Sequence, residues 1–85
     1  MKKIVFGSHA ENKFAILKRH GFDVSKDTIL SALETPDKLE TGHRERKIAQ
    51  KIINESHVIR VVFEEVQGVV RVITFYPGRR ERYES

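Results

Sequence analysis

The side chains in this sequence that are suited to chemistry are mainly His, Lys, Arg and Tyr, because Cys is absent and no acyl-transfer motif occurs. Such a set can cleave RNA without a metal ion. In that reaction the 2′-hydroxyl attacks its own phosphate, a base takes the hydroxyl proton, an acid protonates the leaving 5′-oxygen, and cations stabilise the extra charge on phosphorus. Imidazole can serve as the base or the acid.

Two of these side chains, His9 and Lys13, lie one turn apart on a predicted helix. At about 100° per residue, His9, Lys13 and His20 fall within roughly 40° of one another on the helical wheel. A rise of about 1.5 Å per residue separates His9 from Lys13 by roughly 6 Å and from His20 by roughly 16 Å. We therefore expect His9 and Lys13 to line one site, with an ordinary solvated position as the alternative for His9.

The C-terminal segment gathers Arg79, Arg80 and Arg82 next to Tyr83. Guanidinium groups bind phosphate bidentately, and an aromatic ring stacks on nucleobases. The segment is therefore a candidate RNA contact, and a charged, solvated chain end is the alternative.

Arginines also occur within two predicted strands. Arg60 and Arg71 are expected to form salt bridges with Glu64 or Glu65 on a face of the sheet, because charge pairs of this kind are common in sheets. A structural role is therefore the first interpretation of both arginines.

The bulk properties limit the classes of protein that fit. The 85 residues suffice for one domain, which we take to span 1–85. Sixteen Lys and Arg against 12 Asp and Glu give a net charge of +4, which is compatible with a polyanionic partner and does not require one. No Walker loop, dinucleotide fingerprint or histidine pair at ligand spacing occurs, so we expect no metal and no other cofactor.

The N-terminus does not resemble an export signal. Its apolar run, Ile4–Phe6, is shorter than the about 7–15 residues of a signal-peptide core. No stretch approaches the roughly 20 apolar residues that span a membrane. We therefore expect a cytoplasmic protein without membrane contact, in agreement with the absence of Cys.

Two helices are predicted in the N-terminal half. The residues Ser8 and Glu11 have the spacing of a capping box. The helix that they open should end at His20, with Gly21 in the C′ position.

The second helix should begin after Ser25, a candidate N-cap, with Asp27 in its first turn. Val24 and Ile29 have the spacing of a hydrophobic staple. Pro36 should stop the helix near position 35.

The rest of the chain favours strands, which are rich in Val, Ile and Phe. A hairpin turn is predicted at residues 66–68, and Pro77 with Gly78 should end the sheet. The order β-α-α-β-β-β-β predicts an α+β fold in which two N-terminal helices pack on one face of an antiparallel sheet. The predicted strands are Lys3–Phe6, Lys38–Thr41, Glu45–Ile53, Val58–Glu65 and Val69–Tyr76. For Glu45–Ile53 a helix is the alternative, because its apolar residues do not alternate cleanly.

Nearly the whole chain resembles a family of small prokaryotic domains of unknown function, BrnT-like, which is placed among RelE/ParE-like toxins. Each motif is short, and their order and spacing carry the resemblance. The motifs are His9-Ala10-Glu11-Asn12-Lys13-Phe14, Lys18-Arg19-His20-Gly21-Phe22, Pro36-Asp37, Ile59-Arg60-Val61-Val62-Phe63, and the segment from Val72 to Tyr83.

The resemblance implies a RelE/ParE-like domain that is the toxin of a toxin–antitoxin system. The resemblance implies that the protein cleaves mRNA, including mRNA bound to the ribosome, or arrests translation, and that a small antitoxin protein encoded by a neighbouring gene inhibits it. The catalytic residues that we expect are His9, Lys13, Arg79 and Tyr83, and the expected RNA contacts are Arg80, Arg82, Arg46 and Tyr76. Two alternatives remain open: a non-catalytic, ParE-like binder of gyrase or another partner protein, and a plain RNA-binding module.

Overall fold

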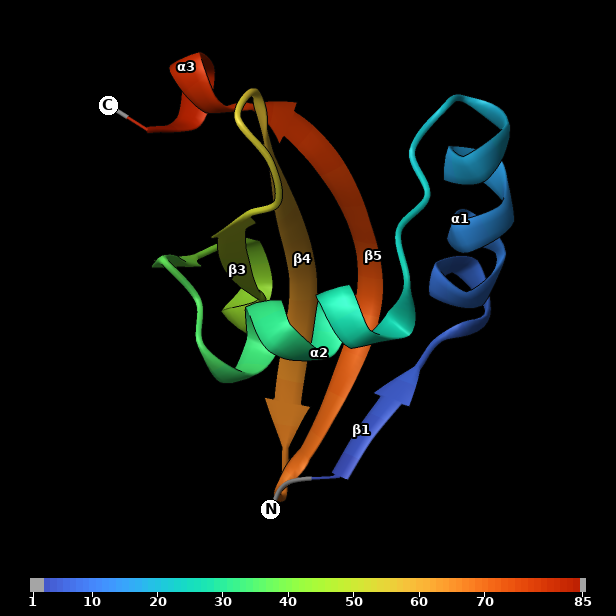
Figure 1. The fold of residues 1–85 in the computed structure, drawn as a ribbon. Helices are drawn as coiled ribbons and strands as arrows, with labels where there is room; N and C mark the ends of the chain where they lie inside the picture. The colour runs from blue at the N-terminus through green and yellow to red at the C-terminus, as the bar shows by residue number, and fades with distance from the viewer. Residues whose placement is uncertain (1–2, 85) are drawn as a thin grey trace.

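The chain forms one sheet with two helices on one of its faces (Figure 1). The computed structural model describes residues 3–84, apart from the side chain of His43. Over these residues the architecture is α+β, as predicted. The elements are β1 (Lys3–Phe6), α1 (Ser8–Arg19), α2 (Lys26–Glu34), β2 (Lys38–Thr41), the 3-10 turn η1 (His43–Glu45), β3 (Lys47–Ile52), β4 (His57–Val66), β5 (Val69–Arg79) and α3 (Arg80–Tyr83).

The sheet is mixed, so the prediction of a purely antiparallel sheet is wrong. Its five strands have the order β1-β5-β4-β3-β2, and the neighbours from β5 to β2 are antiparallel. The first strand, β1, lies beside the last strand, β5, and is parallel to it. The two helices connect β1 to β2, at the opposite edge of the sheet. The alternation of side chains within a strand does not indicate which strand will be its neighbour after such a connection.

The start of α1 differs from the predicted capping box. Gly7 is the N-cap, no side chain caps the helix, and the Glu11 N–H donates to the Gly7 carbonyl at 3.0 Å. The Glu11 carboxylate instead binds the Lys26 ammonium at 2.8 Å. The prediction that Ser8 and Glu11 cap each other is therefore wrong, because Glu11 has a partner on the next helix.

The end of α1 is confirmed. Gly21 has a φ of 90°, in the left-handed region that favours glycine. Its N–H donates to the Lys18 carbonyl at 3.1 Å, and the Phe22 N–H donates to the Leu17 carbonyl at 2.9 Å. These two bonds form a Schellman motif, which stops the helix.

The limits of α2 are also confirmed. The Ser25 side chain accepts a hydrogen bond from the Thr28 N–H at 3.2 Å, and the helix ends at Glu34, before Thr35 and Pro36. The helix then packs on β3 and β4.

The β4–β5 hairpin turns at Gln67 and Gly68, as predicted, and both have positive φ values of 51° and 78°. This is the backbone of a type I′ turn. Strand β5 continues through Pro77 and Gly78, so the prediction that they end the sheet is wrong. Because β1 covers only 69–72 of β5, β5 is an edge strand at Pro77, where the missing N–H is tolerated.

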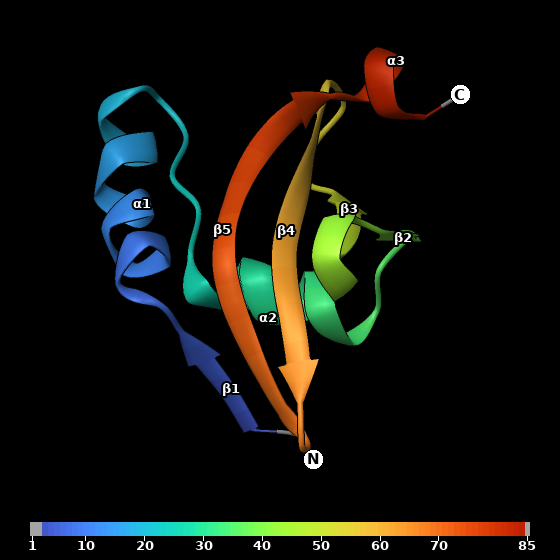
Figure 2. The ribbon, with the colours of Figure 1, turned by 180° about the vertical axis from the view of Figure 1, so that it is seen from behind.

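The two faces of the sheet differ in what covers them. On β4, Ile59, Val61 and Phe63 point toward α1 and α2 and belong to the buried core. Arg60 and the other alternate residues of β4 point to the opposite side, which we call the open face. Seen from behind, the helical elements of residues 3–84 on this face are α3, near the end of β5, and the 3-10 turn η1 (Figure 2). Across residues 3–84, no helix is long and apolar enough to cross a membrane.

Candidate functional site

A hollow of about 160 Å³ lies at the open face. At about 30 Å³ for each water molecule, it has room for roughly five waters. It brings together the start of α1, the loop before β3, and the strands β4 and β5. The residues that line it are Gly7, Ser8, His9, Arg46, Glu64, Arg71 and Ile73.

Two local features place the start of α1 beside β5. The Gly7 N–H donates to the Val72 carbonyl at 3.0 Å, which fixes the point where β1 gives way to the helix. The β4–β5 register shifts between Val62 and Phe63, which leaves Ile73 as an extra residue in β5. Such a bulge re-aims the neighbouring side chains, and Ile73 is itself part of the hollow.

The hollow is electropositive. Arg71 faces Glu64 across the β4–β5 ladder, with 3.9 Å between their charged atoms, and its side chain is 62% exposed. Over the described residues, the side chains of Arg46 and His9 make no hydrogen bond or ion pair. The hollow also lies at the N-terminus of the 12-residue helix α1, whose free N–H groups favour an anion.

A second group of charged side chains, the Arg60 cluster, lies on the open face nearer to α3. The Arg60 guanidinium donates to Glu40 at 2.6 Å, to the Tyr76 hydroxyl at 3.1 Å and to the Gln50 side-chain oxygen. The Tyr83 ring covers it, with 4.3 Å from the guanidinium carbon to the ring centroid. We define the Arg60 cluster as these five residues.

The Arg60 cluster is a closed structural network. Arg60 is almost fully buried, and the Gln50 amide donates to the Tyr83 carbonyl at 3.2 Å, which fixes α3 to the sheet. The hydrogen bond from Arg60 lowers the pKa of the Glu40 carboxyl. Burial alone would lower the pKa of Arg60, but its bonds to Tyr76 and Glu40 outweigh burial and raise it.

The structure brings together only some of the residues predicted for the site. His9 and Arg46 line the same hollow, whereas Lys13 is half-buried on α1 and does not line it. Arg79 is the last residue of β5, at the end of the strand away from the hollow, and Tyr83 follows it on α3. Arg71 and Arg79 are near opposite ends of this 11-residue strand, so at about 3.3 Å per residue roughly 25 Å of strand separates them.

The remaining predicted RNA contacts lie away from the hollow. Tyr76 belongs to the Arg60 cluster. The Arg80 side chain is paired with Glu84, whose hydrogen bond raises the pKa of Arg80. Arg82 is exposed on α3, and the Arg79 side chain, 72% exposed, is 3.9 Å from the Glu81 carboxylate.

Sequence reasoning missed Glu64 and Arg71 as parts of a site, although it predicted that they pair. The ladder confirms that pairing. Arg60 pairs with Glu40 on β2, so the expectation of a Glu64 or Glu65 partner is wrong for Arg60. The alternation of β4 and β5 could have identified the shared face of Glu64 and Arg71, but not its closeness to His9.

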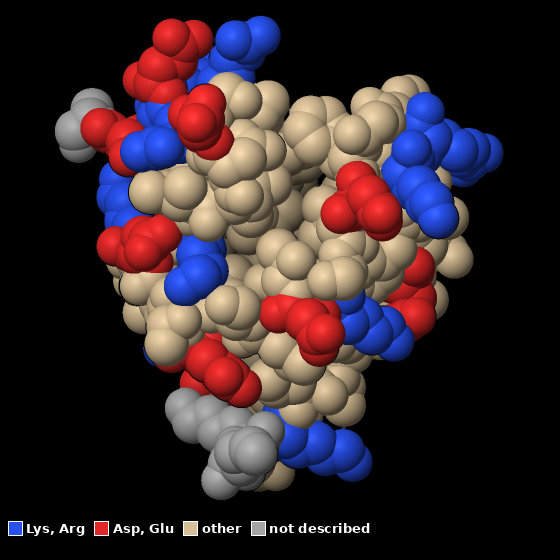
Figure 3. All heavy atoms as spheres, in the orientation of Figure 1, with Lys and Arg blue, Asp and Glu red and all other residues tan. Residues whose placement is uncertain are grey.

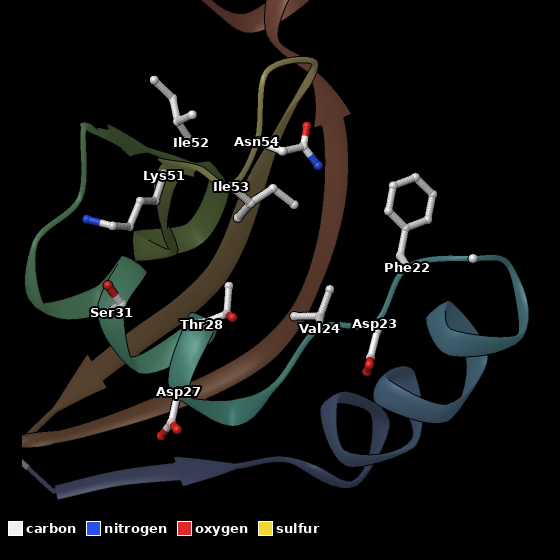
Figure 4. Close-up of a pocket in the computed structure, with 11 residues that line it drawn as sticks. Phe22, Asp23, Val24, Asp27, Thr28, Ser31, Lys51, Ile52, Ile53 and Asn54 are labelled. Atoms are coloured by element: carbon white, nitrogen blue, oxygen red, sulfur yellow. The ribbon is translucent and has the colours of Figure 1, made fainter.

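A larger hollow, of about 540 Å³, lies on the helix side of the molecule (Figure 4). It is lined by the α1–α2 loop, α2 and the end of β3. Its carboxylates, Asp23 and Asp27, would repel phosphate, and its Lys51 ammonium is held by the Thr35 carbonyl at 2.8 Å. On this side, acidic and basic side chains are interspersed (Figure 3), so the open-face hollow is the better anion site.

No group of three or more His, Asp or Glu that could hold a metal ion occurs among residues 3–84. No protein-family model, no curated protein and no solved structure matches the chain. The chemistry of the open-face hollow therefore supplies the functional information.

Proposed function

We propose that the protein is a metal-independent endoribonuclease, the toxin of a toxin–antitoxin system of the RelE/ParE-like type. The observation that carries the proposal is one hollow that joins a carboxylate, Glu64, an imidazole, His9, and two guanidinium groups, Arg46 and Arg71. This set contains a base, an acid and the cations that phosphodiester cleavage needs.

Each group has one role in the proposed reaction. The Glu64 carboxylate takes the proton of the 2′-hydroxyl, whose oxygen then forms a bond to phosphorus. Arg46 and Arg71 stabilise the negative charge that develops on the phosphate oxygens. The bond from phosphorus to the 5′-oxygen breaks, and protonated His9 gives its proton to that oxygen. The products are a 2′,3′-cyclic phosphate and a free 5′-hydroxyl.

The polyanionic substrate and the toxin role agree with the charge of the chain. The net charge of +4 is compatible with RNA, which is a polyanion. A small acidic antitoxin from a neighbouring gene would neutralise the basic hollow, and mRNA, free or on the ribosome, is the proposed substrate.

The test is cleavage of a bulk mRNA by the purified protein in EDTA, with and without ribosomes. We expect fragments with 2′,3′-cyclic phosphate ends. His9→Ala and Glu64→Gln should each lower the cleavage rate by about 10²- to 10⁴-fold, the range for loss of an acid or base.

The matched controls are His20→Ala and Glu81→Gln, which remove the same chemical groups outside the hollow. Both should cleave at the wild-type rate. If a folded wild type does not cleave in either condition, the catalytic proposal is wrong, and a toxin or RNA-binding protein without catalysis takes its place. If His9→Ala retains full activity, the proposed site is wrong.

A further inference from the structure

A second hollow adjoins the first on the open face. It measures about 360 Å³, and Arg46 belongs to the lining of both hollows. The loop around η1, yellow-green in Figure 2, lies on this side of the sheet. The lining residues are Gly42, Arg44, Arg46, Ile48 and Val62.

The floor of the second hollow is apolar. Ile48 and Val62 lie opposite each other in the β3–β4 ladder, both on the open face, and both are only half-buried. A flat aromatic ring can pack on such an apolar floor, and a guanidinium group at the wall can stack on the ring or bind its edge.

The walls of the second hollow provide hydrogen-bond donors. The polar side chains among its lining residues are Arg44 and Arg46, and the Arg46 carbonyl is already bonded to the Gly42 N–H. Over residues 3–84, the Arg44 and Arg46 side chains make no hydrogen bond or ion pair. A ligand in this hollow must therefore have hydrogen-bond acceptors for the two guanidinium groups.

The loop that carries these arginines is held in an unusual conformation. Arg44 and Glu45 have positive φ values of 56° and 65°, in the left-handed region that non-glycine residues rarely adopt. A Cβ at Gly42 would lie 3.1 Å from the Arg46 carbonyl oxygen, so any other residue at this position would require the loop backbone to shift. Strain of this kind gathers at ligand sites, and here it sets Arg44 at the hollow.

We infer that the second hollow binds the unpaired nucleobase next to the cleaved phosphate, and that it prefers guanine. The inference rests on the proposed ribonuclease function, because the shared Arg46 links the two hollows. Guanine presents two acceptors, O6 and N7, to one guanidinium, whereas adenine presents a donor beside N7. A base can enter only when it is unstacked, so the substrate is single-stranded RNA.

The test uses uridine oligonucleotides of about 12 nucleotides, within the range bound by single-strand readers. Each carries one central guanosine, adenosine or abasic site, with a 2′-deoxy sugar at that position to block cleavage there. We expect the guanosine strand to bind about tenfold more tightly than the adenosine and abasic strands. Arg44→Met should abolish this difference.

A matched control, Arg79→Met, removes an exposed arginine outside both hollows and should retain the guanine preference. Equal affinities for all three strands, from a wild type that still cleaves mRNA, would overturn the base site and leave the proposed function intact. If the wild type neither binds the oligonucleotides nor cleaves mRNA, both proposals are wrong. Arg44→Lys gives a second variant with the charge retained, and it too should lose the preference, since a point charge cannot bind two acceptors side by side.

Discussion

Two places on the same side of the sheet, the Arg60 cluster and the hollow at the start of α1, surround their arginines in opposite ways. In the Arg60 cluster the guanidinium is buried, donates to three side chains and is covered by the Tyr83 ring. In the hollow at the start of α1, the Arg71 side chain is 62% exposed with one long contact, and Arg46 has no partner among the described residues.

The difference separates arginines that hold the fold from arginines that are free to bind. A buried guanidinium whose three nitrogens each have a partner in the fold is not accessible to a ligand, and its removal leaves buried partners unsatisfied. An exposed guanidinium contributes little to stability and keeps its donors for phosphate. Residue type does not distinguish the two surroundings, and neither does position in a strand for Arg60 and Arg71, because they lie on the neighbouring strands β4 and β5.

The largest expected effect concerns the hollow. The double substitution Arg46→Gln with Arg71→Gln should lower the cleavage rate by about 10³-fold or more, because both donors to the transition state are lost. The free energy of unfolding should change by less than about 0.5 kcal/mol. Cleavage assays and urea denaturation measure the two quantities.

The control for the double variant is Arg79→Gln with Arg82→Gln, which makes the same change in net charge outside the hollow. It should cleave within a few-fold of wild type. A loss of activity as large as that of the hollow variant would mean that overall charge, and not the hollow, drives cleavage.

The next effect concerns the Arg60 cluster. Arg60→Met should lower the free energy of unfolding by about 2–3 kcal/mol, because Gln50 is buried and loses its partner while Glu40 loses its counter-charge. Urea denaturation measures the loss. At temperatures where the variant is folded, its cleavage rate should stay within a few-fold of wild type. A stability equal to that of Arg79→Met would show that the cluster is not structural.

A smaller effect is expected where α3 meets the sheet. A Cβ at Gly78 would lie 2.4 Å from a ring carbon of Tyr83, so Gly78→Ala should displace that ring and lower the free energy of unfolding by about 1–2 kcal/mol. The same substitution in a Tyr83→Ala background should cost much less, because the clash is gone. Equal costs in the two backgrounds would contradict this contact.

The smallest effect is a dependence on pH. Because the pKa of Glu40 is lowered in the folded state, the unfolded state binds more protons as the pH falls, so folding loses stability as the pH drops through the ordinary carboxyl range and below it. Glu40→Gln should remove this part of the loss, which is under about 1 kcal/mol for a pair at this exposure. Thermal melts across that range measure it. An unchanged slope in the variant would assign the acid sensitivity to other carboxylates.

Much of the local structure was predictable. The end of α1 at Gly21, the cap of α2 at Ser25 and the turn at Gln67 and Gly68 all follow from residues within a few positions of each feature. The prediction failed at Glu11, because the competing partner Lys26 is on another helix. The prediction that the sheet ends at Pro77 also failed. Strand β1 does not pair with that part of β5, so the missing N–H of proline leaves no hydrogen bond unmade.

The candidate site was predictable only in part. His9 was identified from its place in the first turn of a helix, and Arg46 was among the expected RNA contacts. Arg79 and Tyr83 were grouped with them by their chemistry, but about 25 Å of β5 separates that end of the strand from the hollow. Chemical type selects candidates, and it does not give the distances between them.

The sequence by itself determined where most of the helices and strands begin and end, because caps, turns and side-chain alternation act over a few residues. Only the tertiary structure decided that β1 joins β5 in parallel, that Arg60 pairs with Glu40, and that the hollow forms. Each of these contacts joins segments that are distant along the chain. Their pairing is set by the route of the helical connection and by the burial of one sheet face, which the fold as a whole must satisfy.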